Sequence, residues 1–357
     1  NIPDTSQWST AFTAWWQNDG LPFMAVGNYV DLNDPKGPFF ACDTHQILEP
    51  KGNIYKSNKL EPGFCSLSML TAKDASGEMR LRISNDRQYY VRNGYEQMWD
   101  LSDQRFLTAA DGWDKFSIWA MGIASRDITG DGRDEVVLTS MGDQLLRLAN
   151  SDGTYKNAPF EIGTYAHKPY FGDDGRPSTG WHAQFSDINN DGLADLFIAK
   201  GNVDQMPSNA IKDPNNLLIQ QTNGIFQEVG LEAGIASLER GRGAALADFD
   251  LDGRIDILVM NRRAPMEIYR NVTKNTGNWL AIQLVQKGGN INAIGSRITI
   301  GKDSQQVTIG GGHAGGQALP IHFGLGDAKT AIINIEWPDG SLTEHKTNTN
   351  QILKIRH

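Results

Sequence analysis

The chain has 357 residues, of which 39% are hydrophobic and 21% are charged, and this balance excludes wholesale disorder. No uninterrupted apolar run of about 18 residues occurs, so the sequence predicts no membrane-spanning helix. The formal net charge of −9 at pH 7 argues against a nucleic-acid partner and favours cations. The 38 glycines indicate many tight turns, which is typical of an all-β repeat protein.

The first 20 residues differ in pattern from the rest of the chain. Four large side chains are spaced as the apolar face of a short helix: Trp8, Phe12, Trp15 and Trp16. Thr5 or Ser6 is a suitable N-cap, and Gly20 a suitable end. Residues 1–20 are therefore predicted to form a helical extension that packs as a cap.

The two cysteines, Cys42 and Cys65, are too few for a disulfide scaffold and too far apart for a zinc or redox motif. Two interpretations stay open. The pair forms one disulfide that links the first two β units, or each cysteine is a separate buried thiol.

Three segments repeat at spacings of 60 and 61 residues: DITGDGRDE at 127–135, DINNDGLAD at 187–195 and DFDLDGRID at 248–256. An apolar strand follows each segment, and a second hairpin-like signature follows 20 to 30 residues later. Two upstream copies have decayed: in one, Asp74 and Gly77 remain, but Ala72 and Arg80 replace the first and last acids. Five units of four short strands predict a β-propeller over residues 21–278.

After residue 279 the repeat gives way to other strand-like runs, which predict a second β-rich unit over residues 279–357. Two arrangements of these strands stay open. They add blades to the propeller, for a total of six or seven blades, or they form a separate β-sandwich. Seven-bladed closure is the prediction preferred here.

The repeated loops have the form D-x-[DNT]-x-D-G-x-x-[DE], which places alternating oxygen donors around a tight glycine turn. A hard cation such as Ca²⁺ takes six to eight oxygen ligands, and Mg²⁺ fits less well because it requires octahedral geometry and keeps its waters. One ligand in each loop is the backbone carbonyl of Arg133, Leu193 or Arg254. The predicted side-chain ligands are Asp127, Thr129, Asp131 and Glu135 in the first loop, Asp187, Asn189, Asp191 and Asp195 in the second, and Asp248, Asp250, Asp252 and Asp256 in the third.

Two alternatives compete with a calcium site in these loops. An EF-hand requires a bidentate Glu at position twelve and flanking helices, whereas these loops end with an acid at position nine and run into strands. The other alternative is that the loops are Asp-Gly turns without metal. This alternative is disfavoured, because the same acidic pattern would have to occur three times in register by coincidence. We therefore expect three structural calcium ions.

The loops and their strands resemble FG-GAP or VCBS repeats, which build the propellers of integrin α-subunits and many secreted bacterial proteins. The C-terminal unit resembles an ASPIC/UnbV domain in the runs NWLAIQL (278–284), AIGSR (293–297), GGGHAGGQ (310–317), HFGLG (322–326) and EWPDG (336–340). The combination is similar to the cartilage acidic protein group and its bacterial relatives. This resemblance implies calcium in the blades and an extracellular or periplasmic location, although the first two units have lost ligands.

Residues just before the metal loops, at the start of the innermost strands, are candidates for ligand binding over a propeller channel. These candidates are Trp119, Trp181, His182, Arg240 and Arg242. The same residues equally suit ordinary blade packing. His313 and His322 are interpreted as turn and strand residues of the C-terminal unit.

Two classes of function remain. The first is an exported, calcium-stabilised interaction or scaffold module for a protein or glycan. The second is an enzyme, a lyase or a biosynthetic cyclase, with a pocket over the channel. No recognised catalytic motif occurs, which favours the first class.

Overall fold

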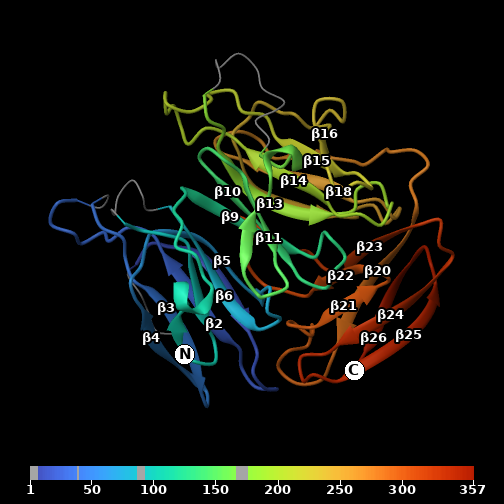
Figure 1. Cartoon of the computed structure of the whole chain (residues 1–357), viewed down its shortest axis with the longest axis horizontal. Helices are drawn as coiled ribbons and strands as arrows, with labels where there is room; N and C mark the ends of the chain where they lie inside the picture. The colour runs from blue at the N-terminus through green and yellow to red at the C-terminus, as the bar shows by residue number, and fades with distance from the viewer. Residues whose placement is uncertain (1–6, 38–39, 87–92, 166–175) are drawn as a thin grey trace.

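The computed structural model describes residues 7–37, 40–86, 93–165 and 176–357, and in this part of the chain the regular structure is strands and two short 3-10 turns. Five antiparallel sheets follow one another as blades, running from blue to orange in Figure 1, and the red C-terminal sheets lie beside them. The turns, Ala109–Asp111 and Phe160–Ile162, lie in connections between blades. The all-β propeller-like prediction is confirmed.

Blade 1 begins where a helix was predicted, and that prediction is wrong. Residues 1–6 lie outside the described residues, and Ser9–Trp15 form strand β1. Trp15 lies opposite Phe23 in the register with β2, and their rings stack with centroids 5.6 Å apart. Thr and aromatic residues favour strands, and pairing with β2 overrides the helical spacing of the aromatic residues. The other strands of blade 1 are β2 (Phe23–Asn28), β3 (His45–Lys51) and β4 (Ile54–Leu60).

Blades 2 to 4 repeat this four-stranded order, and blade 5 has three strands. Blade 2 contains β5 (Ser66–Lys73), β6 (Met79–Asn85), β7 (Gln97–Asp100) and β8 (Arg105–Phe106). Blade 3 contains β9 (Ala120–Arg126), β10 (Glu135–Ser140), β11 (Leu145–Ala149) and β12 (Tyr155–Asn157). Blade 4 contains β13 (Gly180–Ser186), β14 (Asp195–Lys200), β15 (Asn216–Gln220) and β16 (Phe226–Glu228). Blade 5 contains β17 (Gly241–Ala247), β18 (Asp256–Asn261) and β19 (Glu267–Tyr269).

The innermost strands pack in series, β1 on β5, β5 on β9, β9 on β13 and β13 on β17. Apolar side chains fill the space between successive blades. Val137 and Leu146 of blade 3 pack with Leu196 and Ile198 of blade 4. Burial between neighbouring sheets therefore holds the arc of blades together.

The C-terminal strands form a sandwich and not further blades. Two sheets, β23-β20-β26 and β22-β21-β24-β25, share one apolar core that includes Ile282, Phe323, Ile298 and Ile333. Seven-bladed closure is therefore not found: the described residues form five blade sheets. The C-terminal strands are β20 (Asn278–Val285), β21 (Arg297–Ile300), β22 (Asp303–Gln306), β23 (Ile321–Gly326), β24 (Thr330–Glu336), β25 (Leu342–Asn348) and β26 (Gln351–Arg356).

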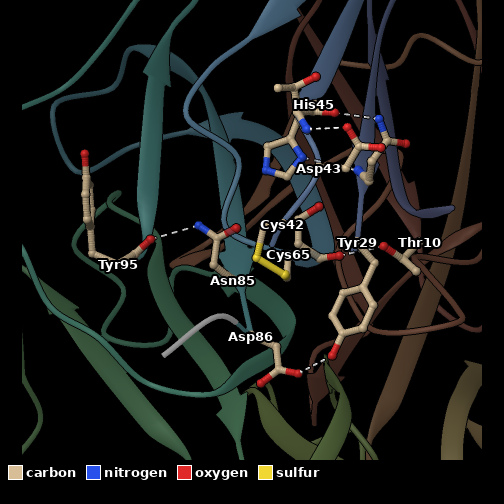
Figure 2. Close-up of a disulfide and its surroundings, with 12 residues drawn as sticks. Thr10, Tyr29, Cys42, Asp43, His45, Cys65, Asn85, Asp86 and Tyr95 are labelled. Carbon is tan, nitrogen blue, oxygen red and sulfur yellow. Dashed lines mark hydrogen bonds between the residues drawn. A yellow bond between two sulfur atoms is a disulfide. The ribbon is translucent and has the colours of Figure 1, made fainter. Parts of the chain in front are cut away.

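Cys42 and Cys65 form a disulfide, which decides between the two interpretations of the cysteines. The bond joins the β2–β3 connection of blade 1 to the residue before β5 of blade 2 (Figure 2). Nearby, the Tyr29 hydroxyl donates to the Asp86 carboxylate at 2.7 Å. The first two blades are thus linked covalently as well as by packing.

A loop of the C-terminal sandwich, residues 309–316, fills the centre of the arc; we name it the central loop. It contacts all five inner strands. The Thr13 hydroxyl of β1 donates to Ile309 O, and Gly311 N and Gly312 N donate to Met69 O of β5 and Ile123 O of β9. His313 contacts His182 of β13, and Gly243 of β17 lies against Ala314.

Candidate functional site

The three predicted metal loops connect the inner strand to the second strand in blades 3, 4 and 5, and they share one hydrogen-bond pattern. The first aspartate of each loop accepts the amide of the glycine at position six: Asp127 from Gly132 at 2.7 Å, Asp187 from Gly192 at 2.7 Å, and Asp248 from Gly253 at 2.8 Å. These glycines have φ of 87°, 88° and 88°, which side chains with a Cβ rarely adopt.

The acid at position nine ties the loop to the third strand of its blade or to the residues just after that strand. Asp195 accepts hydrogen bonds from Ile188 N at 2.8 Å and Gln220 N at 2.9 Å. Asp256 does the same for Phe249 N at 3.0 Å and Asn271 N at 2.8 Å. The repeat pattern predicts these acids only as metal ligands, and it carries no signal for this second role.

The donor set fits a hard cation best in the third loop. Carboxylate oxygens of Asp248, Asp250 and Asp256 lie within 4.8 Å of one another. Asp252 instead pairs with Arg254, and the Arg270 guanidinium contacts Asp250 at 2.6 Å. Oxygen donors at this separation are the kind that Ca²⁺ takes. In the first two loops, Thr129 and Asn189 hold the place of Asp250 in the repeat.

Burial raises the pKa of several loop carboxyls. It raises the pKa of Glu135 and of Asp187 to about 7, and that of Asp195 well above its usual value. Burial also raises the pKa of Asp127 and Asp248. A cation among these groups would favour their ionised forms.

In blade 2 an arginine lies among the carboxylates of the decayed loop. Arg80 lies between two carboxylates, with its Nε 3.3 Å from Asp74 and its Nη1 2.7 Å from Asp100. Asp74 assumes the position of the first acid, because its Oδ1 accepts the amides of Ser76 and Glu78. The decayed loop is therefore shorter than the repeat alignment predicts and carries its own positive charge.

The metal loops also form the surface on which the C-terminal sandwich rests. The Asn190 side-chain oxygen lies 2.7 Å from His322 Nε2, and Asn190 O accepts the amide of Gly326 at 2.8 Å. The buried guanidinium of Arg297 contacts Asp134 at 2.6 Å. His322, interpreted from sequence as a strand residue, does lie in β23, but its contact with a loop 132 residues away has no local signal.

The central loop covers two of the five predicted ligand-binding residues. His182 is fully buried, and its Nδ1 accepts the His313 amide at 3.3 Å. The centroids of the Trp181 and His313 rings are 4.9 Å apart. The Arg242 guanidinium carbon lies 4.0 Å from the centroid of the Trp181 ring. Burial lowers the pKa of both His182 and His313 to about 4, so the pair is neutral at pH 7.

A cavity of about 80 Å³ beneath the central loop has mixed walls, with apolar residues such as Leu70 and Ile123 beside the polar Arg126, Asp134 and Gln184. A larger pocket, of about 620 Å³, lies between blades 3 and 4 and is lined in part by Asp127, Thr129 and Gly192. Trp119 lies just before β9, apart from the His182–His313 pair, and its indole N–H is buried without a hydrogen-bond partner.

Arg240 and Arg242 belong to a cluster that sequence reasoning found only in part. Asp204, in the β14–β15 connection, is contacted by Arg240 at 2.7 Å, Arg262 at 3.0 Å and Arg263 at 3.5 Å. Arg242 donates to backbone carbonyls, including Val203 O at 2.8 Å. Burial, then the neighbouring Arg262 and Arg240, lower the pKa of Arg242 to about 9.

Family models match both halves of the architecture. An FG-GAP-like repeat model matches residues 127–198 and 187–259, and an ASPIC and UnbV model matches residues 286–357. The chain combines FG-GAP-like repeats with an ASPIC and UnbV domain. The residues that the FG-GAP-like repeat model matches include all three predicted metal loops. No described helix is long and apolar enough to cross a membrane.

Among curated proteins, the chain is similar to cartilage acidic protein 1 from three animals. It is 22% identical to the Homo sapiens protein over 181 residues, which are 48% of this chain and 27% of that protein. Identity is 25% over 127 residues for Mus musculus and 27% over 124 residues for Xenopus tropicalis, each 32% of this chain. Those matches cover 20% and 19% of the relatives, so each match spans about a quarter or less of the relative.

Two solved structures are similar at a lower level. One is an Agrocybe aegerita lectin that recognises non-reducing terminal N-acetylglucosamine, with a TM-score of 0.40 and 13% identity over 96% of this chain and 86% of the lectin. The other is an exo-β-1,3-galactanase from Phanerochaete chrysosporium, with a TM-score of 0.27 and 10% identity over 92% of this chain and 72% of the enzyme. At these scores neither likeness bears on function.

Proposed function

We propose that this chain is an exported, calcium-stabilised propeller that serves as an interaction module for another macromolecule. The observation that carries the proposal is the threefold repetition of the metal loops. Each places an aspartate against the amide of a left-handed glycine and an acid at the start of the next strand. Calcium in these loops is structural, because they also support the C-terminal sandwich.

An interaction module accounts for the filled channel better than an enzyme does. The lyase or cyclase alternative requires a pocket over the channel, and the central loop occupies that position. His182 and Trp181 pack on His313 rather than face an open space.

The disulfide supports an extracellular or periplasmic location. Disulfides persist in oxidising compartments and are rare in the cytosol, where thiols are kept reduced. Cys42 and Cys65 connect blades 1 and 2 close to the hydrogen bond between the Tyr29 hydroxyl and the Asp86 carboxylate. We therefore expect the secreted protein to contain the Cys42–Cys65 disulfide.

Calcium titration tests the module. We expect isothermal calorimetry to show calcium uptake and EDTA to lower the melting temperature by several degrees, with magnesium restoring little of it. The matched variant Asp127→Asn/Asp187→Asn/Asp248→Asn should melt at one temperature with or without calcium. No heat of calcium binding and an unchanged melting temperature in EDTA would overturn the proposal.

A further inference from the structure

Four arginines gather at the end of blade 5 that lies opposite its metal loop. Arg240 and Arg242 lie at the start of β17, and Arg262 and Arg263 follow the end of β18. The metal loop of blade 5 joins the other ends of these two strands. Asp204, in the β14–β15 connection of blade 4, is the acid with which three of the arginines pair. The cluster is therefore built from two blades and is separate from the predicted calcium sites.

The guanidinium groups lie close together because they share acceptors. Arg240 Nη1 lies 2.7 Å from Asp204 Oδ1, and Arg262 Nη1 lies 3.0 Å from the same oxygen. Arg242 Nη2 and Arg262 Nη1 both donate to Val203 O at 2.8 Å. Positive charges at such short separations repel one another. Burial, and then the charges of Arg262 and Arg240, lower the pKa of Arg242 to about 9.

A single carboxylate offsets the four positive charges. Among the described residues, the ion pairs of these arginines are all with Asp204. Glu239 precedes Arg240 in the chain, but it is exposed and forms no ion pair within the described part of the chain. Four positive charges against one negative leave an excess of three, in a chain whose net charge is −9. Such a local departure from balanced charge is typical of a site that receives an anion.

Three of the arginines retain unused donors. In Arg240, Arg262 and Arg263, only Nη1 has a hydrogen bond or ion pair with a described residue. Nε and Nη2 of each guanidinium therefore have no protein acceptor among those residues. The three side chains are 28%, 33% and 66% exposed, so a ligand can reach them from solvent. Unused guanidinium edges bind oxyanions through paired, charge-assisted hydrogen bonds.

The turn that carries Asp204 is held in place before any ligand arrives. Asn202 is fully buried, and its Oδ1 accepts the amides of Asp204 at 3.1 Å and Met206 at 2.9 Å. Arg242 donates to Asn202 O at 2.9 Å and lies over the Trp181 ring. Arg242 thus fixes the floor of the cluster, and little ordering of the chain opposes binding.

We propose that Arg240, Arg262 and Arg263 form a binding site for a tetrahedral oxyanion, a sulfate or phosphate group that is free or carried on a larger ligand. A tetrahedral oxyanion offers three or four acceptor oxygens to the three guanidinium groups, whereas a carboxylate offers two. The inference rests on the proposed interaction function and names the ligand class that the module recognises. The site itself uses no calcium.

Isothermal calorimetry of the full chain at constant ionic strength measures the binding. The probes are sodium sulfate with calcium present, sodium phosphate in EDTA because calcium phosphate precipitates, and sodium acetate as the planar control. A sulfated heparin disaccharide and the same disaccharide without sulfate show whether the group is bound free or as an ester. Arg262→Gln/Arg263→Gln alters the site, and Arg105→Gln/Arg356→Gln removes two exposed positive charges elsewhere. Arg263→Gln, at the most exposed of the three site arginines, is the variant least able to disturb folding.

We expect sulfate and phosphate to bind at least about fivefold more tightly than acetate. Arg262→Gln/Arg263→Gln should weaken both about tenfold and Arg263→Gln about threefold, whereas Arg105→Gln/Arg356→Gln should bind as the parent does. Tighter binding of the sulfated disaccharide than of free sulfate would support an ester as the ligand, and equal binding would support the free anion.

Three results would overturn the proposal. They are no binding of either oxyanion, equal binding of acetate, which would indicate a partner that offers carboxylates, and equal losses in Arg262→Gln/Arg263→Gln and Arg105→Gln/Arg356→Gln, which would indicate general charge attraction. Calcium uptake without oxyanion binding would remove this site and leave the calcium-stabilised module standing. Oxyanion binding without calcium uptake would keep the site and remove calcium from the proposed function.

Discussion

The carboxylate of Asp256 has two roles that can be separated by mutation. It accepts hydrogen bonds from Phe249 N and Asn271 N, which joins the metal loop to the chain beyond β19. It also lies in the oxygen cluster with Asp248 and Asp250. Asp250 shares only the second role, because its described contact is with the exposed Arg270. Variants of the two aspartates therefore separate a contribution to folding from a contribution to the proposed metal site.

Asp256→Ala should lower the free energy of unfolding by about 2 kcal/mol even in EDTA, because two part-buried amides lose their acceptor. Asp250→Ala should change it by less than about 1 kcal/mol in EDTA, since it breaks only an exposed ion pair. In calcium both variants should lose most of the metal-dependent stabilisation. Urea denaturation with and without calcium measures both effects. Equal losses for the two variants in EDTA would contradict the backbone role of Asp256.

His45 makes stability depend on pH. The side chain is fully buried, burial lowers its pKa to about 4, and its Nδ1 accepts the Asn28 amide at 3.2 Å. The unfolded chain binds a proton near pH 6.5, whereas the folded chain does so only near pH 4. Stability from His45 is thus complete above about pH 6.5 and is lost as pH falls toward about 4.

His45→Asn should keep the acceptor for Asn28 N and remove the titration. Between about pH 7 and pH 5 the parent should lose about 2 kcal/mol more of its unfolding free energy than the variant. Denaturant titrations in EDTA at several pH values measure the difference, and EDTA removes calcium release from the comparison. Parallel stability curves for parent and variant would show that His45 is not responsible.

At the scale of elements, the central loop depends on glycine. Gly312 has φ of 57°, and a Cβ there would overlap the ring of His182. Gly311 and Gly312 also donate their amides to β5 and β9. The backbone can approach the inner strands this closely only because these residues have no side chain.

Gly312→Ala should therefore lower the free energy of unfolding by about 3 kcal/mol, from overpacking and the left-handed backbone together. Gly340→Ala is the matched control, because Gly340 has φ of 83° and open space around it, and it should cost about 1 kcal/mol. Thermal and urea denaturation measure both. If the two variants lose the same stability, the central loop does not pack as closely as described.

Sequence patterns predicted the elements that repeat and missed those that depend on distant contacts. The loops at 127–135, 187–195 and 248–256 were recognisable because glycine and acids recur at a fixed spacing. The strand β1 was mistaken for a helix, because Trp8 and Phe12 fit a helical period whereas pairing with β2 decides the conformation. GGGHAGGQ could be assigned only as a turn, since nothing local shows that it enters another domain.

The same limit applies to the candidate binding residues. Arg240 and Arg242 were found because they lie at the start of an inner strand of the repeat. Arg262, Arg263 and Asp204 were missed, because they lie in connections that follow second strands and have no common motif. A signal was present in the Arg-Arg pair at the end of β18, where the repeat otherwise has no adjacent charges.

At the scale of the molecule, the sandwich docks on the blades through buried ion pairs. Arg297 contacts Asp134, and Arg126 contacts Asp303 at 2.7 Å. Both pairs cross between the propeller and the C-terminal sandwich. Removing one partner leaves the other charge buried and uncompensated, which costs more than the pair contributes.

Arg297→Leu should lower the free energy of unfolding by about 3 kcal/mol, and adding Asp134→Asn should restore part of the loss. Denaturation of the single and double variants measures the coupling. Limited proteolysis of the linker around residues 270–277 should be faster in the single variant than in the parent. Additive losses in the double variant would show that the two residues do not act as a pair.

The position of the central loop determines the order in which the protein is able to fold. The Thr13 hydroxyl donates to Ile309 O, although the two residues are 296 positions apart in the chain. Strands β5 and β9 likewise accept hydrogen bonds from the central loop only when that loop is in place. During synthesis every blade emerges before the segment that fills the centre. Such non-local contacts make folding slow and leave apolar inner strands uncovered meanwhile. A chain that stops before residue 309 would therefore resemble an unfinished folding intermediate, prone to aggregation, and not a smaller propeller.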